Sequence, residues 1–288
     1  MEFCIVIPAH NEADYLSKTL QSLIDQTVLP KKVVVVNDNS TDNTQNIIDS
    51  FTSKYAFIES VLQVSEDLHS PGSKVINAFN KGLESLDATY DVICKFDADL
   101  IFPKHYLATI HQIFQNDPSC GMAGGFCYIE KNGNWVLESL TNKDHIRGAL
   151  KAYRKECFHQ IGGLKNVMGW DTVDELLAQY HGWTVSTDTS LHVKHLKPTG
   201  ASYSRAARFK QGEAFHRMQY GFLLTNIASA KLAWNKKNFL FYIHCLQGYR
   251  KAQRDRKPFI VSEAEGKFIR DLRWKNIKKK LLFISSKK

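Results

Sequence analysis

Two features that would place a chain in a special class are missing from this sequence. Its six cysteines form no CxxC pair, and they are scattered as Cys4, Cys94, Cys120, Cys127, Cys157 and Cys245. Such spacing matches neither a zinc site nor a disulfide framework, so we interpret the thiols as reduced, small apolar residues of a cytosolic protein. Internal repeats and low-complexity tracts are absent as well.

Long apolar runs are also scarce. In the C-terminal part of the chain the longest uncharged run, residues 218–230, has 13 residues and contains Gln219 and Asn226. A membrane-spanning helix needs about 20 apolar residues, so this run predicts a packed or interfacial helix. Because Glu2 stands directly before a short strand-like run, we expect no secretory leader.

The composition is that of a soluble globular protein, with 43% apolar and 23% charged residues among 288. The net charge of +9 is unevenly distributed. Residues 231–288 hold 17 Lys and Arg against 4 Asp and Glu, a net of +13, which leaves the rest of the chain at −4. Such a basic end is typical of a solvated helix or of a segment that meets an anionic membrane surface. No recognition motif accompanies it, so we expect no nucleic acid partner.

The first hundred residues alternate between strand-like and helix-like patterns. We predict strands at 3–7, 32–36, 57–64 and 92–96, and helices at 13–26, 39–54 and 73–86. Apolar strands that alternate with helices indicate an α/β fold with a mostly parallel sheet flanked by helices. In such a sheet, ligands bind beyond the carboxyl ends of the strands.

After residue 102 the pattern loosens. We predict helices at 106–116 and 171–180, strands at 121–128, 183–186 and 191–195, and a hairpin turn at Lys131-Asn132-Gly133. Helices rich in basic residues follow. These patterns predict an α/β domain at residues 1–205, with a first half at about 1–100 and a second half at about 101–205, and a basic helical C-terminal extension at 206–288.

Two carboxylates, Asp97 and Asp99, stand directly after the predicted strand 92–96 with Ala98 between them. Side chains at i and i+2 of an extended segment project to the same side. Their oxygens suit Mg²⁺ or Mn²⁺, and such an ion can bridge to a diphosphate. Aspartate is also common in turns after strands, so it is the position at the mouth of a parallel sheet that favours a metal site.

Two polar loops follow the predicted strands 3–7 and 32–36. They are Pro8-Ala9-His10-Asn11-Glu12 and Asn37-Asp38-Asn39-Ser40-Thr41-Asp42. The N–H groups at such helix starts bind anions, and a loop carboxylate accepts hydrogen bonds from a base or a ribose. Helix capping is the alternative role for Asn11, Ser40 or Asp42, but it does not explain Asp38, which precedes the cap.

Three segments together resemble the family 2 glycosyltransferases with the GT-A fold, over about residues 1–200. They are Val-Ile-Pro-Ala-His-Asn-Glu, Val-Val-Val-Asn-Asp-Asn-Ser-Thr-Asp-Asn-Thr and Phe-Asp-Ala-Asp, in this order. The resemblance implies inverting sugar transfer from a UDP- or GDP-linked donor with Mn²⁺ or Mg²⁺. It implies that Asp99 binds the metal and that Asp97 lies near both the metal and the ribose. The nucleotide contacts that it implies are Pro8, Ala9, Asn11, Glu12, Asp38, Lys74, Asp97 and Ala98.

The resemblance further implies a catalytic base, because inverting transfer needs a carboxylate that deprotonates the acceptor hydroxyl. In relatives this base is the aspartate of a Glu-Asp pair about eleven residues before an Ala-Gly-Tyr-like helix end, which matches Asp171 ahead of Gly182-Trp183. Trp170 replaces the glutamate, so Asp174 is kept as a rival base. Asp171 with Asp174 also fits a helix cap.

A histidine at a similar distance past the base is a third metal ligand in many relatives, and spacing favours His195 over His192. Imidazole is an acceptable Mn²⁺ ligand beside carboxylates, although a surface histidine is the alternative. Trp170, Trp135 and Tyr128 are candidates for stacking on an acceptor sugar, unless they belong to the core.

From these features we predict a hexosyl- or N-acetylhexosaminyl-transferase of polysaccharide or cell-envelope synthesis that acts on a glycan or lipid-linked acceptor. We expect it in the cytoplasm, with peripheral contact to the inner face of the membrane through residues 231–288. One alternative is a degenerate module that binds nucleotide or glycan, which the missing glutamate before Asp171 keeps open. Another is a sugar-phosphate nucleotidyltransferase, which is disfavoured because Ala-His-Asn-Glu replaces the glycine-rich basic loop that such enzymes need.

Overall fold

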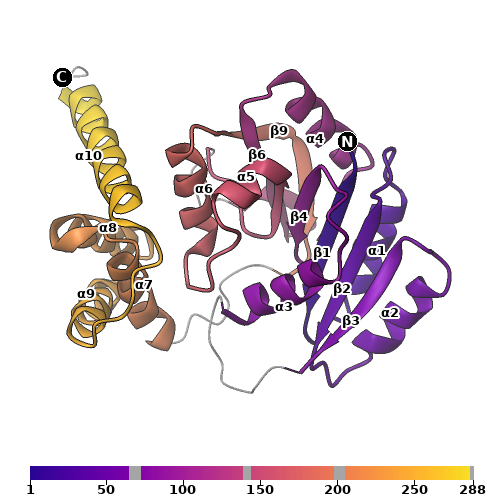
Figure 1. Ribbon diagram of the computed structural model, residues 1–288. Helices are drawn as coiled ribbons and strands as arrows, with labels where there is room; N and C mark the ends of the chain where they lie inside the picture. The colour runs from indigo at the N-terminus through magenta and orange to yellow at the C-terminus, as the bar shows by residue number, and fades with distance from the viewer. Residues whose placement is uncertain (65–72, 139–143, 198–204, 286–288) are drawn as a thin grey trace. The chain divides into compact units, whose positions relative to one another are not determined.

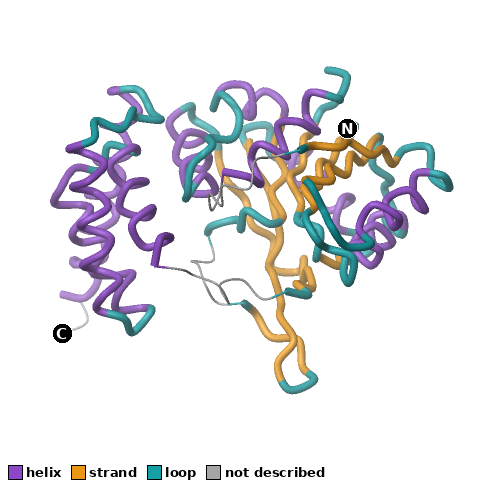
Figure 2. The backbone as a smooth tube through the Cα atoms, turned by 90° about the horizontal axis from the view of Figure 1, so that it is seen from below, coloured by secondary structure: helices purple, strands orange, loops and turns teal. Residues whose placement is uncertain are grey.

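The computed structural model describes residues 1–64, 73–138, 144–197 and 205–285 (Figure 1). The chain divides into two compact units, residues 1–166 with 170–199 and residues 200–288 with 167–169. Every strand of the described residues lies in the first unit, whereas 205–285 is helical with short connections (Figure 2).

The first unit opens with four parallel strands in the order β3-β2-β1-β4. They are β1 (Phe3–Ala9), β2 (Lys32–Asp38), β3 (Ile58–Gln63) and β4 (Val92–Phe96). The helices between them are α1 (Leu16–Ile24), α2 (Thr44–Thr52) and α3 (Ser73–Glu84), and Figure 1 shows α3 on the opposite side of these strands from α1 and α2. The valines at 33–36 are fully buried because helices cover both faces of the sheet. The predicted α/β class is confirmed.

Close packing of α3 on the sheet depends on one glycine. A Cβ at Gly82 would lie 2.6 Å from the side chain of Val6 and 2.7 Å from that of Val36. Real Cβ atoms do not approach so closely, so a larger residue would push the helix away from β1 and β2.

The sheet continues through the second half of the unit in the order β8-β6-β9-β5, with β7 beside β6. These strands are β5 (Leu100–Ile101), β6 (Cys120–Lys131), β7 (Asn134–Leu137), β8 (Leu150–Arg154) and β9 (Thr184–His195). The covering helices are α4 (Tyr106–Asn116), α5 (Lys155–Gln160) and α6 (Trp170–Tyr180). β8 runs antiparallel to both β4 and β6, so strand direction reverses where the two halves of the sheet meet.

Several predicted elements differ from the observed ones. The two strands expected at 183–186 and 191–195 are one strand, β9, because a register shift against β6 between Gly124 and Phe126 absorbs the polar residues between them. The helices expected from 13 and 39 begin later, at Leu16 and Thr44, because polar loops occupy the preceding residues. The predicted hairpin turn is confirmed, with left-handed Asn132 and Gly133 joining β6 to β7.

The second unit contains α7 (Arg205–Arg217), α8 (Gly221–Asn235), α9 (Phe239–Arg254) and α10 (Glu263–Ser285). α7 and α9 touch backbone to backbone at two glycines. A Cβ at Gly212 would lie 1.8 Å from the carbonyl oxygen of Cys245, and one at Gly248 would lie 2.0 Å from that of Phe209. Among the residues described, no helix combines the length and apolar character needed to cross a bilayer.

Candidate active site

Three carboxylates lie just beyond neighbouring parallel strands. Glu12 follows β1, Asp38 ends β2 and Asp99 follows β4. Each has one buried oxygen without a hydrogen-bond partner, namely Glu12 Oε2, Asp38 Oδ1 and Asp99 Oδ1. Leaving such an atom unpaired costs about 1–3 kcal/mol, so each is expected to meet a donor or a cation of a ligand. The structure thus brings together three residues that the sequence placed at the nucleotide and metal.

The loop after β1 is tied to the loop after β2. The N–H of Asn11 donates to Ser40 Oγ at 3.0 Å, and the N–H of Thr41 donates to Asn11 Oδ1 at 2.8 Å. Asn11 and Asn39 both adopt left-handed backbone, at φ 55° and 58°, a conformation that asparagine tolerates. Asn11 therefore joins the two loops through its side chain.

Two further contacts fix the same pair of loops. The N–H of Ala13 donates to Asp42 Oδ2 at 3.1 Å, and the N–H of Glu12 donates to Thr44 Oγ1 at 2.9 Å. Asp42 also accepts the N–H of Thr44 at 3.0 Å, but the N-cap of α2 is Asn43, so Asp42 precedes the cap. The Glu12 carboxylate lies 3.1 Å from Lys197 Nζ, and burial raises the pKa of Glu12 despite this contact.

The other predicted nucleotide contacts lie on the flanks of these loops. Pro8 and Ala9 form the last two positions of β1, next to Val36 and Asn37 of β2. Lys74 is half-buried in the first turn of α3. The residues before this helix, 65–72, are outside the described part of the chain.

The turn that carries Asp97, Ala98 and Asp99 is held by α1. Thr19 is fully buried; its hydroxyl donates to the carbonyl of Ala98 at 2.7 Å and accepts the N–H of Leu100 at 3.0 Å. The side chain of Asp97 is 35% exposed and pairs with the buried ammonium of Lys95. The side chain of Asp99 is only 10% exposed. Thr19 escaped the sequence analysis because it occupies an ordinary core position of a helix.

His195 reaches Asp99 through strand pairing, since it lies opposite Leu100 at the end of β9. Its Nε2 is 3.5 Å from Asp99 Oδ2, and its Nδ1 is 2.8 Å from Glu138 Oε2. Glu138 is buried and also pairs with Arg147. Burial lowers the pKa of His195, but Asp99 and Glu138 outweigh it and raise that pKa to about 9. The predicted neighbourhood of Asp99 and His195 is thus present, and Glu138 is an addition that the sequence did not reveal.

These donors suit a divalent cation. Asp97 and Asp99 offer carboxylates, the Asp99 Oδ1 atom is buried without a partner, and His195 Nε2 faces the same carboxylate. Two carboxylates with one imidazole match the ligand preferences of Mn²⁺, and the carboxylates alone suit Mg²⁺. The residues present therefore fit the metal that the sequence motif predicts.

A second grouping of potential ligands overlaps the first. Cys127, Glu138 and His195 offer atoms within 4.8 Å of one another, and all three are buried. Burial raises the pKa of the Cys127 thiol to about 12, so it stays protonated, and Glu138 is already engaged by Arg147 and His195. We therefore assign Glu138 to the support of His195 and not to a separate site.

Asp171 stands in the first turn of α6 with a side chain that is 35% exposed. Its Oδ2 lies 3.8 Å from His145 Nε2, and His145 Nδ1 lies 2.8 Å from Glu175 Oε2. Burial acts to raise the pKa of Asp171, but His145 and Lys151 outweigh it and hold that pKa below its usual value. The pKa of His145 is raised to about 9 because Asp171 and Glu175 together outweigh its burial.

Asp174 has very different surroundings, with 1% of its side chain exposed. Both of its oxygens accept from Lys151 Nζ, at 2.9 and 3.0 Å. Its Oδ2 also accepts from the Tyr153 hydroxyl at 2.6 Å, and its Oδ1 accepts from the N–H of Glu175 at 2.7 Å. Every oxygen of this carboxylate is thus occupied within the core.

Trp170 is buried between two lysines. The Nζ atoms of Lys95 and Lys151 lie 5.4 and 5.9 Å from the centroid of its ring, and these lysines are paired across β4 and β8. Trp170 is 7% exposed, so it belongs to the core and does not offer its ring to an acceptor sugar. The core was the second of the two roles that the sequence left open for it. Single lysines within apolar strands, Lys95 in β4 and Lys151 in β8, are the signal in the sequence that indicates buried charge here.

The segment at residues 148–149 contacts both the turn that carries Asp97 and Asp99 and the start of α6. The N–H of Asp97 donates to the carbonyl of Ala149 at 2.9 Å. A Cβ on Gly148 would lie 3.1 Å from Asp171 Cβ, so the two backbones are in close contact there. Asp97 and Asp171 therefore flank one short segment, although 74 positions separate them in the sequence.

The other predicted aromatic residues contact residues of β9. Tyr128 lies against His192 with ring centroids 4.1 Å apart and ring planes tilted by 32°, and Lys194 Nζ lies 5.0 Å from the centroid of the Trp135 ring. His192 thus belongs to a ring contact and not to the Asp99 cluster. His195 is the histidine that lies beside Asp99, and its role as a metal ligand stays a prediction.

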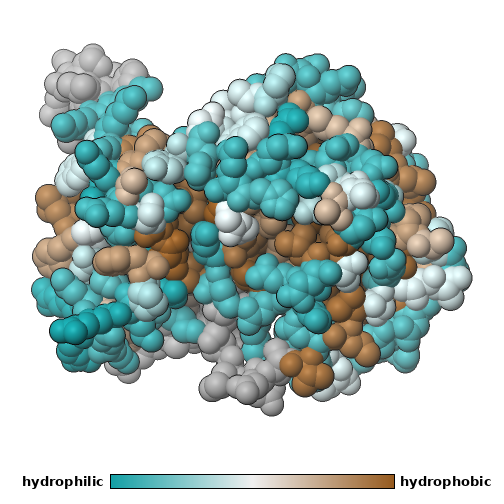
Figure 3. All heavy atoms as spheres, in the orientation of Figure 1, coloured by the Kyte–Doolittle hydropathy of each residue, from teal (hydrophilic) through white to brown (hydrophobic). Residues whose placement is uncertain are grey.

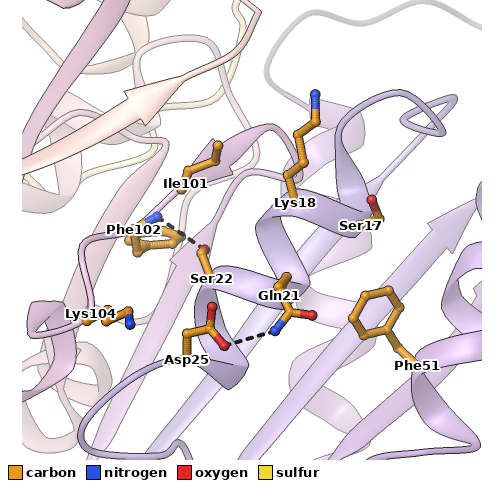
Figure 4. Close-up of a pocket in the computed structure, with 9 residues that line it drawn as sticks. All are labelled: Ser17, Lys18, Gln21, Ser22, Asp25, Phe51, Ile101, Phe102 and Lys104. Carbon is orange, nitrogen blue, oxygen red and sulfur yellow. Dashed lines mark hydrogen bonds between the residues drawn. The ribbon is translucent and has the colours of Figure 1, made fainter.

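A surface hollow of about 530 Å³ lies away from these groups, between α1 and the segment around β5 (Figure 4). Phe102, Ile101 and Phe51 supply its apolar lining, and Gln21 donates to Asp25 at its rim at 2.9 Å. It contains none of the predicted site residues.

Several known proteins are similar to this chain. The profile of the family described as Glycosyl transferase family 2 matches residues 4–165. The probable glycosyltransferase YdaM of Bacillus subtilis is 33% identical over 200 residues, which cover 61% of this chain and 44% of that protein. The chain spans about half the length of the curated relatives it matches.

Two solved structures share the fold. TarS 1–349 of S. aureus in complex with UDP-GlcNAc is 17% identical with a TM-score of 0.57. The match covers 74% of this chain and 65% of the TarS chain. The mannosyltransferase PcManGT of Pyrobaculum calidifontis in complex with GDP-Man and Mn²⁺ is 16% identical with a TM-score of 0.57. The match covers 93% of this chain and 78% of the PcManGT chain.

Proposed function

Because the chain belongs to glycosyltransferase family 2, we propose that it transfers a sugar from a UDP- or GDP-linked donor to a glycan or lipid-linked acceptor, with inversion at the anomeric carbon. The observation that carries this proposal is the set of unpartnered buried oxygens on Glu12, Asp38 and Asp99, beyond three neighbouring strands. Ligands of open α/β sheets bind at this edge. The donors bound by the two solved structures of similar fold support a nucleotide sugar.

In this proposal the linked loops receive the nucleotide. Asp38 and Glu12 offer carboxylate oxygens to base and ribose donors, while Asn11, Pro8 and Ala9 shape the floor of the loops. Lys74 at the start of α3 supplies positive charge near this edge. Asp97 and Ala98 complete the nucleotide contacts, and Asp97 also takes part in metal binding.

Asp99, Asp97 and His195 would hold Mn²⁺ or Mg²⁺. When bound, the ion supplies positive charge that stabilises the diphosphate as it leaves. His195 is aimed by Glu138, because the contact at Nδ1 leaves Nε2 directed to Asp99. A carboxylate behind a ligating histidine fixes both its tautomer and its orientation.

Asp171 is the proposed base. Its carboxylate takes the proton of the acceptor hydroxyl, whose oxygen forms a bond to the anomeric carbon from the face opposite the diphosphate. The bond between that carbon and the diphosphate oxygen breaks, and the diphosphate leaves with the electron pair, so a single displacement inverts the centre. His145 stays cationic at neutral pH because of its raised pKa, and it keeps Asp171 ionised until the acceptor arrives.

A degenerate binding module is the second candidate, since Trp170 stands in place of the usual glutamate. The pair of His145 and Glu175 offers Asp171 a different support, which favours the enzyme. Measurement of donor turnover with Mn²⁺ separates the two candidates. Tight nucleotide binding without any sugar transfer or donor hydrolysis would leave only the module.

Removal of the Asp99 carboxylate is expected to abolish metal-dependent donor binding. In Asp99→Ala we expect Mn²⁺ to bind at least about 100-fold more weakly, since a direct ligand contributes more than a residue behind it. Thermal shift with Mn²⁺ and UDP- or GDP-sugars measures the effect through the stabilisation that a ligand adds. Asp49→Ala, on the exposed side of α2, is the control and should bind like the parent.

Glu138→Gln tests the support of His195 separately. The substitution keeps the shape of the side chain but removes the charge that holds the imidazole, and we expect Mn²⁺ affinity to fall about 10–100-fold. Titration of Mn²⁺ followed by electron paramagnetic resonance measures this without turnover. Glu130→Gln, at an exposed position of β6, is the matched control. Unchanged affinity in Glu138→Gln would show that His195 needs no such support.

The acceptor belongs to the same proposal. We infer that residues 231–288, with their net charge of +13, keep the enzyme at the inner face of the membrane, where lipid-linked acceptors lie. A polysaccharide or cell-envelope glycan is the product that fits this location.

A further inference from the structure

α8 has an apolar face that the described residues leave uncovered. Leu223, Ile227 and Trp234 are 62%, 38% and 85% exposed. Their spacing of four and seven residues places them on one side of the helix. Its other side, with Leu224, Thr225, Ser229 and Ala233, is buried. Figure 3 shows apolar side chains at the surface over α8. We call Leu223, Ile227 and Trp234 the α8 ridge.

Two more apolar side chains follow directly after the ridge. Phe239 is 72% exposed and Leu240 is 56% exposed in the first turn of α9. Asn238 caps this helix by accepting the N–H of Phe241, whose ring is buried. The start of α9 is therefore a fixed turn and not a frayed end, so the exposure of Phe239 and Leu240 is a property of the fold.

The charged residues of α8 and α9 all have one sign. Residues 214–254 contain no Asp or Glu, while Lys231 lies within α8 and Lys236 and Lys237 form the turn to α9. If a second copy of this chain bound with its own ridge to this one, the lysines of the two copies would face each other and repel. An anionic bilayer surface offers the opposite charge at the headgroups and an apolar layer beneath them. Tryptophan is enriched at that boundary.

We propose that the α8 ridge, with the turn into α9, is the surface by which this protein docks on an anionic membrane. This inference rests on the proposed function, in which the protein contacts the membrane peripherally. It places that contact on the α8 ridge and the turn into α9, and no longer on the whole of residues 231–288. Within the predicted segment 231–288, the apolar residues Phe241 and Ile269 are buried, 4% and 0% exposed, and the side chains of 281–283 are outside the described residues. The ridge itself begins before the predicted segment 231–288, at Leu223.

Docking in this way resembles the insertion of an amphipathic helix at the interface. The apolar side chains enter the boundary between headgroups and acyl chains, and lysines beside them pair with lipid phosphates. Apolar burial and charge attraction both contribute, so binding should need anionic lipid and should weaken as salt is added.

The test uses the full chain and vesicles of phosphatidylcholine, alone or mixed with phosphatidylglycerol. We expect the parent to co-sediment with the mixed vesicles, and the variant Leu223→Ser with Trp234→Ser to bind them at least about tenfold more weakly. Leu62→Ser is the matched control, because Leu62 is 67% exposed on β3 and should not matter for binding. Both changes lie at exposed positions, so unchanged thermal unfolding would verify that the fold is intact.

Three results would overturn the proposal. They are equal binding of the ridge variant and the parent, no binding of the parent to mixed vesicles, and a parent dimer that the ridge variant dissociates. Mn²⁺-dependent nucleotide binding is measured on the same samples. It distinguishes a failure of the membrane-docking proposal, in which nucleotide still binds, from a failure of the proposed function, in which it does not. A variant that loses vesicle binding but keeps nucleotide binding supports the ridge.

Discussion

Replacement of Asp171 by asparagine is expected to lower the rate of sugar transfer by about 10²–10⁴-fold, the usual contribution of a general base. The amide keeps the size of the side chain but cannot take a proton. Donor binding should be unchanged, because the proposed nucleotide contacts and metal ligands lie on other elements. A transfer assay with separate determination of kcat and of donor affinity measures the effect. A variant with the parent kcat would remove Asp171 from the role.

The pH profile discriminates between the two candidate bases. A base is active when deprotonated, so the rate falls as pH drops through its pKa. The pKa of Asp171 lies below its usual value, because His145 and Lys151 outweigh its burial, so the acid limb of the profile should lie below the usual range of an aspartate. Burial raises the pKa of Asp174 to about 6, so a limb near that pH would favour Asp174 instead. Geometry favours Asp171, since only its side chain is open to solvent.

Lys151→Ala is expected to produce the largest loss of stability. Lys151 is fully buried and pairs with Asp174 at 2.9 Å and with Glu175 at 3.1 Å. Its removal leaves Asp174 buried without a cation and leaves Glu175 with His145 alone, and breaking a buried ion pair from one side costs about 3–5 kcal/mol. Urea unfolding followed by circular dichroism measures the free energy of unfolding.

Lys81→Ala is the control for this experiment. Lys81 forms an ion pair with Glu84 on the surface of α3, and both side chains are more than half exposed. Exposed pairs contribute about 0–1 kcal/mol, so its loss should barely move the unfolding midpoint. Equal effects of the two substitutions would mean that the cluster around Lys151 is not a stabilising network.

The sequence predicted the parts of the fold that depend on short-range patterns. The runs of valine and isoleucine in β1, β2 and β4 have an apolar pattern that only a covered sheet satisfies, and polar residues directly after them mark the strand ends. Strand order then brings Glu12, Asp38 and Asp99 to one edge without further information.

The parts that escaped prediction depend on contacts between distant segments. β8 contains Lys151 and Arg154, and nothing in its own sequence shows that carboxylates from α6 will neutralise the lysine. Glu138 likewise meets His195 only where β9 pairs with β6. Periodicity cannot detect a buried charge whose partner is far away in the sequence.

The loops after β1 and β2 have a consequence for entropy. Hydrogen bonds within the chain, between Asn11 and Thr41 and between Ala13 and Asp42, hold the two loops together. The conformational freedom of these residues is therefore lost when the chain folds, and nucleotide binding does not have to order them. A site that is ordered in advance keeps more of its contact energy as affinity, and it selects its donor by a shape that is fixed beforehand.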